Sequence, residues 1–339
     1  MRELPISTEL EGRLVVDQFD SAVLRDNPLG DSAKRNHIVY LPPGYDEGSQ
    51  RYPVIFCLAG FTGTSWSFTN YDPFVPTLPQ RFETLMREGR SGPAIMVMVD
   101  GMTGVGGNQY INSEAVGRHE DHIIEELVPY IDREYRTLGD GHRGVKGKSS
   151  GGYGAMMHAF RHSDVWSVAA CHSGDMYFEY CYLPDFPGAI EGLKGHEDVA
   201  AWFRSLRAKP KLAEGDHKTL NALAMAAFYS PKPNEPMGID LPFDRATGRM
   251  RDEVWARWLQ NDPVRLVEQH ADALRSLKLL YIDCGTKDQF NLQHGARILV
   301  AHLQQLGVKH HYEEFDDTHM GIQYRYDVSL PLLVAALSA

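Results

Sequence analysis

The stretch Arg143-Gly-Val-Lys-Gly-Lys-Ser-Ser-Gly-Gly-Tyr-Gly154 contains the pattern G-x-S-x-G, with Ser149 at its centre. This pattern is typical of a sharp turn between a strand and a helix that lifts a serine hydroxyl clear of the backbone. Glycines two before and two after the serine suit such a turn, because neighbouring backbone can then pass without Cβ clashes. Ser149 is therefore the candidate nucleophile.

The residues around the pattern supply the context that the turn requires. Gly144 and Val145 can end a short buried strand, and residues 155–160 are apolar enough for a buried helix. Two other interpretations fail on spacing. A phosphate-binding loop needs glycine where this chain has His142, and a dinucleotide-binding fingerprint needs glycine where it has Gln109.

Length and charge limit the class of protein. The chain has 339 residues, which allows one large domain or two small ones, and 43% of them are hydrophobic, which is ample for a core. A formal net charge of −11 argues against binding to nucleic acid or to an anionic membrane surface. No run approaches the roughly 20 apolar residues of a membrane span. The first ten residues lack the apolar core of a signal peptide.

The cysteines and histidines give no sign of a metal site. Cys57, Cys171 and Cys284 lie in apolar, strand-like runs, where a free thiol behaves as a small hydrophobe, and no C-x-x-C motif occurs. This usage fits a reducing compartment, and we expect a cytoplasmic protein. His119-Glu-Asp-His122 spaces its histidines three apart, where the zinc motif H-E-x-x-H needs four. We expect a solvated helix start there, and no metal or other cofactor.

Strand-like and helix-like segments alternate along most of the chain. Residues 52–59 and 94–100 are almost continuously apolar, as in strands that are buried on both faces. Residues 120–135 instead repeat apolar side chains at helical spacing. Further strands are expected at residues 12–23, 35–41, 144–145, 165–171, 277–283 and 310–315, and further helices at 80–87, 155–160, 291–306 and 330–337. This order predicts the α/β class, with a mostly parallel central sheet flanked by helices, as in the α/β-hydrolase fold.

Residues 176–270 interrupt this alternation with short helical patterns and a proline-rich stretch. We interpret them as an inserted helical cap within a single domain, whose core comprises residues 1–175 and 271–339. Large aromatic side chains dominate packing, so we expect those of the cap to pack it onto the core and not to contact substrate. They are Trp202, Phe203, Tyr229, Trp255 and Trp258.

A serine nucleophile needs a base, and the base needs a group that orients it. In this fold the chain order is serine, acid, histidine, with the acid after a late strand and the histidine after the last one. Asp288 follows the strand at 277–283, with Asp283 and then Asp175 as alternatives. His319 follows the last strand and is the expected base. His310 and His311 lie within that strand and are expected to be structural.

The oxyanion hole needs two backbone N–H groups that point to the developing negative charge. One comes from the residue after the nucleophile, Ser150, and the other from the loop after an early strand, where we choose Phe61. Gly60 lets that loop approach the serine. We also expect Gly60, Thr62, Tyr110 and Tyr153 to contact substrate.

With these residues placed, the chain resembles the esterase D-like branch of the α/β-hydrolases. This branch includes S-formylglutathione hydrolases, enterochelin esterase-like proteins and the antigen 85 mycolyltransferases. The likeness covers residues 36–175 and 276–326 and leaves most of the cap unmatched. It rests on several short motifs in the right order: residues 58–64, 108–113, 126–131, 147–152, 172–174, 285–290 and 317–319. Lys148 stands where the family has histidine, and Gly63 where it has cysteine.

The residues and the resemblance together predict a serine carboxylesterase that forms an acyl-enzyme on a small to medium ester. An acyltransferase or a thioesterase would use the same triad, and a ligand-binding protein could keep the fold without turnover. The expected partner is a small-molecule ester, with neither nucleic acid nor membrane, and the sequence allows a homo-oligomer. The aromatic cap indicates a partly apolar substrate pocket.

Overall fold

An eight-stranded sheet runs through the computed structural model, which describes residues 9–339. Residues 1–8, part of the stretch in which we expect no signal peptide, lie outside the described residues. The strand order is β1-β2-β4-β3-β7-β8-β9-β10, antiparallel from β1 to β4 and parallel from β4 to β10. The strands are β1 (Arg13–Asp20), β2 (Lys34–Leu41), β3 (Val54–Leu58), β4 (Ile95–Met98), β7 (Arg143–Lys148), β8 (Val168–His172), β9 (Leu279–Gly285) and β10 (His311–Phe315). The mostly parallel sheet is thus confirmed.

Burial along the strands follows from their positions in the sheet. The central strands β3, β4 and β8 are buried at every residue, which explains their continuous apolar runs. The edge strand β1 instead alternates between half-buried and exposed side chains along most of its length. A separate pair of short strands, β5 (Asn112–Ser113) and β6 (Gly117–Arg118), forms a small hairpin.

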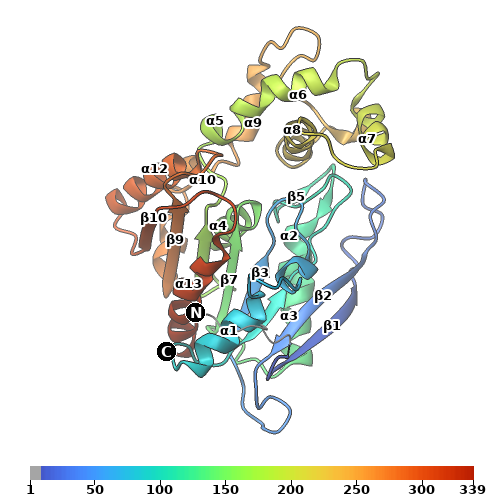
Figure 1. Ribbon diagram of the computed structural model, residues 1–339. Helices are drawn as coiled ribbons and strands as arrows, with labels where there is room; N and C mark the ends of the chain where they lie inside the picture. Colours follow the sequence, from blue (N-terminus) through green and yellow to red (C-terminus); the bar gives the residue numbers. More distant parts are fainter. Residues whose placement is uncertain (1–8) are drawn as a thin grey trace.

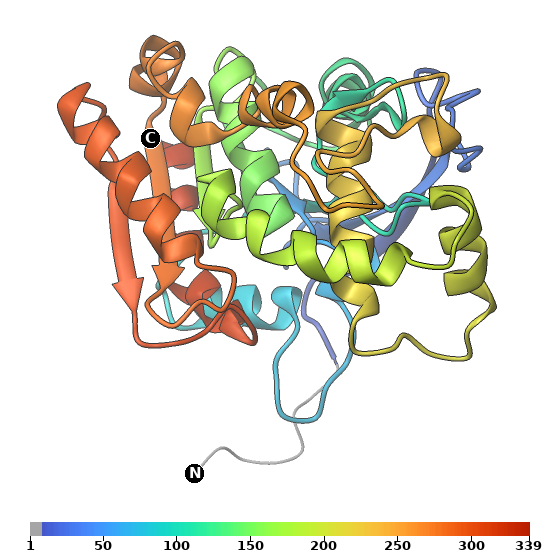
Figure 2. The same ribbon diagram turned by 90° about the horizontal axis from the view of Figure 1, so that it is seen from above.

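Helices cover both faces of the sheet (Figures 1 and 2). On one face, α1 (Leu78–Arg87) and α13 (Tyr326–Ser338) share a core cluster with Ile38, Ile55 and Cys57. On the other face lie α4 (Ser150–Arg161), α12 (Leu292–Gln305) and a helical stretch composed of α2 (His119–Asp121), the π-helix η2 (His122–Leu127) and α3 (Val128–Glu134). Among the described residues, no helix combines the length and the apolar character needed to cross a membrane.

The expectation of a solvated helix start at residues 119–122 is wrong. His119 and Glu120 are both buried, and Arg161 and His162 at the end of α4 pair with Glu120. Glu120 accepts hydrogen bonds from both, each at 2.7 Å, and these partners lower the pKa of its carboxyl to about 2 against the opposing effect of burial. The segment therefore anchors the helical stretch to α4.

Short helices make up the segment between β8 and β9. Figure 1 shows α6, α7, α8 and α9 gathered beyond one end of the sheet. Four of the five cap aromatics are buried and the fifth, Trp255, is half-buried, which agrees with a packing role. The helices are α5 (Phe178–Cys181), α6 (Phe186–Leu193), α7 (Val199–Ala208), α8 (Asp216–Tyr229), α9 (Asp252–Leu259), α10 (Pro263–Leu266) and α11 (Ala271–Ser276). Short 3-10 turns are η1 (Ser65–Phe68), η3 (Leu183–Asp185), η4 (Pro236–Gly238) and η5 (Ile322–Arg325). The division into core and cap stays a prediction.

Candidate active site

Ser149 sits at the turn between β7 and α4, in a backbone conformation that side chains rarely adopt. Its φ of 59° and ψ of −128° lie outside the common regions for a residue with a Cβ. The Ser149 N–H donates to the His172 carbonyl at 3.0 Å, which ties the turn to the end of β8. A Cβ at Gly147 or Gly151 would come closer than 3.0 Å to backbone atoms. These two glycines therefore allow the tight turn that the pattern predicts.

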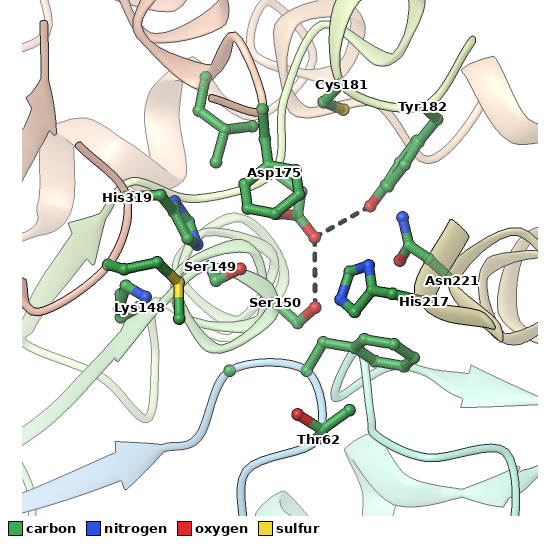
Figure 3. A pocket seen from close by; sticks show the side chains of 15 residues that line it. Thr62, Lys148, Ser149, Ser150, Asp175, Cys181, Tyr182, His217, Asn221 and His319 are labelled. Atoms are coloured by element: carbon green, nitrogen blue, oxygen red, sulfur yellow. Dashed lines mark hydrogen bonds between the residues drawn. The ribbon is translucent and has the colours of Figure 1, made fainter. Parts of the chain in front are cut away.

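His319 and Asp288 meet behind this serine. His319 Nδ1 lies 2.7 Å from Asp288 Oδ2, and both side chains are buried. The Phe290 N–H donates to the other carboxylate oxygen, Oδ1, at 2.9 Å, which fixes the orientation of the carboxylate. In Figure 3 the His319 ring points toward Ser149. With Nδ1–H donating to Asp288, Nε2 is the atom left to act on the serine proton.

The two alternative acids have other partners. Asp283 is fully buried, with His172 Nδ1 at 2.8 Å from one oxygen and Arg325 Nε donating to the other at 3.0 Å. Asp175 accepts hydrogen bonds from Tyr182 and Ser150 through one oxygen, Oδ2, at 3.0 Å and 3.3 Å (Figure 3). Its burial raises the pKa of its carboxyl. The geometry therefore favours Asp288 as the partner of His319.

The backbone around Gly60 forms one wall of the site. A Cβ at Gly60 would lie 3.3 Å from the Ser149 Cβ, so glycine lets the loop approach the serine. The Thr62 N–H donates a hydrogen bond to the Gly106 carbonyl at 2.9 Å, and the Gly63 N–H donates one to the Gly60 carbonyl at 2.9 Å. Neither N–H is therefore free to bind an oxyanion. Phe61 thus remains the candidate oxyanion donor of this loop. Ser150 is the first residue of α4, where a backbone N–H has no partner one turn back in the helix.

A cavity of about 250 Å³, here called the inner pocket, opens above Ser149 and His319. Gly60 and Thr62 line it, as expected from the sequence. The cap contributes further lining residues that sequence reasoning missed, because the insertion carries no recognisable motif: Cys181, Tyr182, His217 and Asn221. Phe290, Leu292 and Met320 were also missed, although they lie next to the predicted acid and base. Rings of Phe61, Tyr182, His217 and Phe290 make much of the lining aromatic.

Two residues expected to contact substrate lie outside the inner pocket. Tyr110 is buried beneath the Gly60 loop, and its hydroxyl donates to the Ala59 carbonyl at 2.8 Å. Tyr153 is fully buried in α4, and its hydroxyl donates to the Asn261 carbonyl at 3.0 Å. Both tyrosines therefore pack beneath the site and bind its backbone, and neither ring lines the inner pocket. Within residues 9–339 no group of three or more His, Cys, Asp or Glu side chains is arranged to hold a metal ion.

Comparison with known proteins defines the class. A family model described as "Putative esterase" matches residues 32–329, so the chain belongs to this esterase family. It is 28% identical over 197 residues to an endo-1,4-beta-xylanase/feruloyl esterase of Xylanibacter ruminicola, and 31% identical over 139 residues to an esterase of Mycobacterium tuberculosis. These matches cover 56% and 40% of this chain, but only 25% and 28% of the respective relatives. The chain thus spans about a quarter of the length of these relatives.

Solved structures agree on the fold. A ferulic acid esterase superposes with a TM-score of 0.63 over 97% of this chain and 100% of that one, at 21% identity. An S-formylglutathione hydrolase from Agrobacterium tumefaciens gives 0.55 over 98% of both chains, at 15% identity. The α/β-hydrolase fold and the esterase D-like resemblance are thereby confirmed. By its family, the chain is an esterase in class.

Proposed function

We propose that Ser149, His319 and Asp288 form the catalytic triad of this esterase. His319 Nε2 takes the Ser149 proton as Oγ attacks the ester carbonyl, and Asp288 orients and charge-stabilises the imidazole. The Phe61 and Ser150 N–H groups receive the oxyanion. His319 then returns the proton to the leaving alcohol, and water hydrolyses the acyl-enzyme by the same route. The observation that carries this proposal is the 2.7 Å contact between Asp288 Oδ2 and His319 Nδ1, because His319 lines the same pocket as Ser149.

We further propose that the inner pocket holds the acyl group, and that a planar aromatic acyl group fits it. Its volume of about 250 Å³ suits a single ring with a short linker, and aromatic side chains line it. The feruloyl and ferulic acid esterases among the relatives and structural neighbours act on acyl groups of that shape, by their names. A flexible aliphatic chain would match this aromatic lining less well and would lose more conformational freedom on binding.

Hydrolysis of p-nitrophenyl acetate, butyrate and octanoate and of methyl ferulate tests both points. Wild type should hydrolyse the short-chain and feruloyl esters faster than the octanoate, and Ser149→Ala should lose almost all activity. Ser163→Ala, at a half-buried turn position that follows α4, is the matched control and should behave as wild type. More than a tenth of wild-type activity in Ser149→Ala would refute the nucleophile. A product ester formed in added methanol would instead reveal acyl transfer.

We also propose that the protein works in the cytoplasm. All four cysteines are free and buried, which supports a reducing compartment. Burial raises the pKa of the Cys57 thiol to about 11 and that of the Cys171 thiol to about 12, so both stay protonated and unreactive.

A further inference from the structure

A second cavity lies on the other side of the Gly60–Gly63 loop from the inner pocket. This outer pocket has a volume of about 610 Å³ and is lined by the loop itself, by most of the residues between Ser67 and Leu78, and by residues that follow His319. The two pockets share Gly60, Phe61, Thr62 and Lys148. An ester bound at Ser149 has two halves that leave its carbonyl carbon in different directions. The site therefore offers one cavity for each half.

The position of His319 indicates which half enters the outer pocket. His319 must return a proton to the oxygen of the leaving alcohol, so that oxygen lies on the side of the His319 loop. His319 and Met320 themselves line the inner pocket, and the same loop continues into Gly321 and Gln323, which form part of the outer pocket wall. The alcohol half accordingly extends into the outer pocket, and the acyl half remains in the smaller inner pocket.

Lys148 gives the junction of the two pockets a positive charge. It is the sole lysine or arginine among the described residues that line either cavity. Within residues 9–339 its ammonium makes neither a hydrogen bond nor an ion pair. Partial burial lowers the pKa of this side chain, although the carboxylates of Asp288 and Asp175 act in the opposite direction. An unpaired, partly desolvated cation beside the nucleophile is a site for an anion.

A second ammonium lies beneath the floor of the outer pocket. Lys146 precedes Lys148 by two residues on β7, so both side chains leave the same face of the sheet. Lys146 is fully buried, and its Nζ has no hydrogen-bond partner among the described residues. The Nζ lies 3.3 Å from the ring centroid of Tyr326 and 5.9 Å from that of Phe68, and both rings line the outer pocket. Its charge therefore adds to the positive potential of that cavity.

The carboxylates nearby do not cancel this charge in the outer pocket. Asp72 is the only acidic residue in the described lining, and its Oδ1 accepts the backbone N–H groups of Phe74 and Val75 at 2.7 Å and 3.1 Å. Asp175 lies in the lining of the inner pocket instead. Lys148 is common to both pockets, whereas the Asp175 carboxyl group lies only on the acyl side and the Lys146 ammonium only beneath the alcohol side.

We propose that the outer pocket binds an alcohol that carries a carboxylate, and that Lys148 contacts this carboxylate. The proposal rests on the esterase mechanism given above. Ser149 Oγ bonds to the acyl carbon, the bond from that carbon to the alcohol oxygen breaks, and His319 passes the serine proton to that oxygen. The products after hydrolysis are an acid and a hydroxy-carboxylate.

The test compares 4-acetoxybenzoate with 4-acetoxybenzamide, which differ by the charge on the leaving phenol. For each enzyme we take the ratio of kcat/KM for the benzoate to that for the benzamide, so that intrinsic reactivity cancels between enzymes. Lys148→Gln should lower this ratio about tenfold, as expected for loss of one charge-assisted contact. Lys148→Arg should retain most of it. Lys194→Gln, an exposed cap lysine paired with Glu191, is the control and should keep the wild-type ratio.

A change of less than threefold in Lys148→Gln would overturn the proposal. Two measurements on wild type stand independently of any variant. The ratio should fall as sodium chloride is raised, because salt screens the contact, and a ratio unaffected by salt contradicts it. The product 4-hydroxybenzoate should slow fluorophosphonate labelling more than 4-hydroxybenzamide does, and equal effects contradict it. If Lys148→Gln instead loses preference for a carboxylate on the acyl side, in 4-nitrophenyl hydrogen glutarate, the assignment to the alcohol is wrong.

Failure of this inference can be told apart from failure of the triad. If Ser149→Ala still hydrolyses both acetoxy esters, the proposed mechanism is wrong. If Ser149→Ala is inactive and the wild-type enzyme shows no charge preference, the triad stands and the outer pocket does not bind a carboxylate.

Discussion

At the scale of single residues, the site depends on backbone that passes very close to other backbone. Ser149 adopts a positive φ that costs on the order of 1–3 kcal/mol and persists only where its surroundings enforce it. Gly147 and Gly151 supply the room, since each faces main-chain atoms and not a flexible side chain. A methyl group at either position has no route to relax without moving the nucleophile.

Gly151→Ala should therefore lose activity and stability together. The new Cβ would meet the carbonyl of Leu58, at the end of β3, and that of Ala59. We expect at least a tenfold loss of kcat and a destabilisation of about 1–3 kcal/mol, as for overpacked core positions. Thermal unfolding measures the loss of stability, and hydrolysis of p-nitrophenyl acetate measures the loss of kcat. Gly215→Ala, where a Cβ meets nothing within 4 Å, is the control; normal activity in Gly151→Ala would contradict the tight-turn account.

The triad predicts an order of severity among its members. His319→Ala removes the base, whereas Asp288→Asn leaves an imidazole that is poorly oriented and lacks its charge partner. Both variants should lose activity by orders of magnitude, with Asp288→Asn the less affected. Initial rates of p-nitrophenyl acetate hydrolysis by the two variants and by wild type measure this order of severity. If Asp288→Asn retains nearly full activity while Asp175→Asn does not, Asp175 is the acid of the triad.

At the scale of elements, β7 and the turn after it place two lysines and the candidate nucleophile within four residues: Lys146, Lys148 and Ser149. The strand is central, so Lys146 is buried between the sheet and the elements η1 and α13, and its Nζ has no hydrogen-bond partner among the described residues. Its burial lowers the pKa of its ammonium to about 8. The face of Tyr326 compensates part of the cost through a cation–π contact.

This lowered pKa makes stability depend on pH. Between about pH 8 and the ordinary lysine pKa near 10.4, the unfolded chain binds more protons than the folded one, so the free energy of unfolding rises with pH. Lys146→Met removes this contribution of the ammonium to the pH dependence of the free energy of unfolding. The stability gained by Lys146→Met should be largest below pH 8 and should shrink by about 2–3 kcal/mol toward pH 10.5.

Urea unfolding at several pH values measures this difference. Tyrosines with raised pKa values act equally in both proteins and cancel. Lys278→Met, at an exposed position, should give a stability difference that does not vary with pH. A difference between wild type and Lys146→Met that is constant from pH 7 to pH 10.5 would contradict the buried-ammonium interpretation.

At the scale of the whole molecule, the parts predictable from sequence were those with a local signal. Continuous apolar runs located β3 and β4, and the G-x-S-x-G turn located Ser149. Asp288 and His319 followed from the order of strands, and their side chains do meet. The cap lining had no such signal, because His217 and Asn221 reach the inner pocket only through the tertiary packing of α8.

Tertiary packing also explains the remaining differences between the expectations from the sequence and the structure. Tyr110 and Tyr153 lie near the nucleophile in space, but their hydroxyls donate hydrogen bonds to backbone carbonyls outside the inner pocket. The histidines at 119 and 122 look solvent-facing in sequence but are buried, and the His122 ring stacks on that of His37 in β2. The charge on the outer pocket depends on which lysines find no partner, and that property appears only when the whole chain is folded.

Labelling with a fluorophosphonate, followed by intact-mass and peptide analysis, tests the central claim most directly. The account predicts one adduct per chain, on the peptide that contains Ser149, with matching loss of ester hydrolysis and no adduct in Ser149→Ala. Asp288→Asn should label more slowly than wild type at the same serine. Ester hydrolysis that persists in fully labelled protein, or an adduct on a different residue, would contradict Ser149 as the nucleophile.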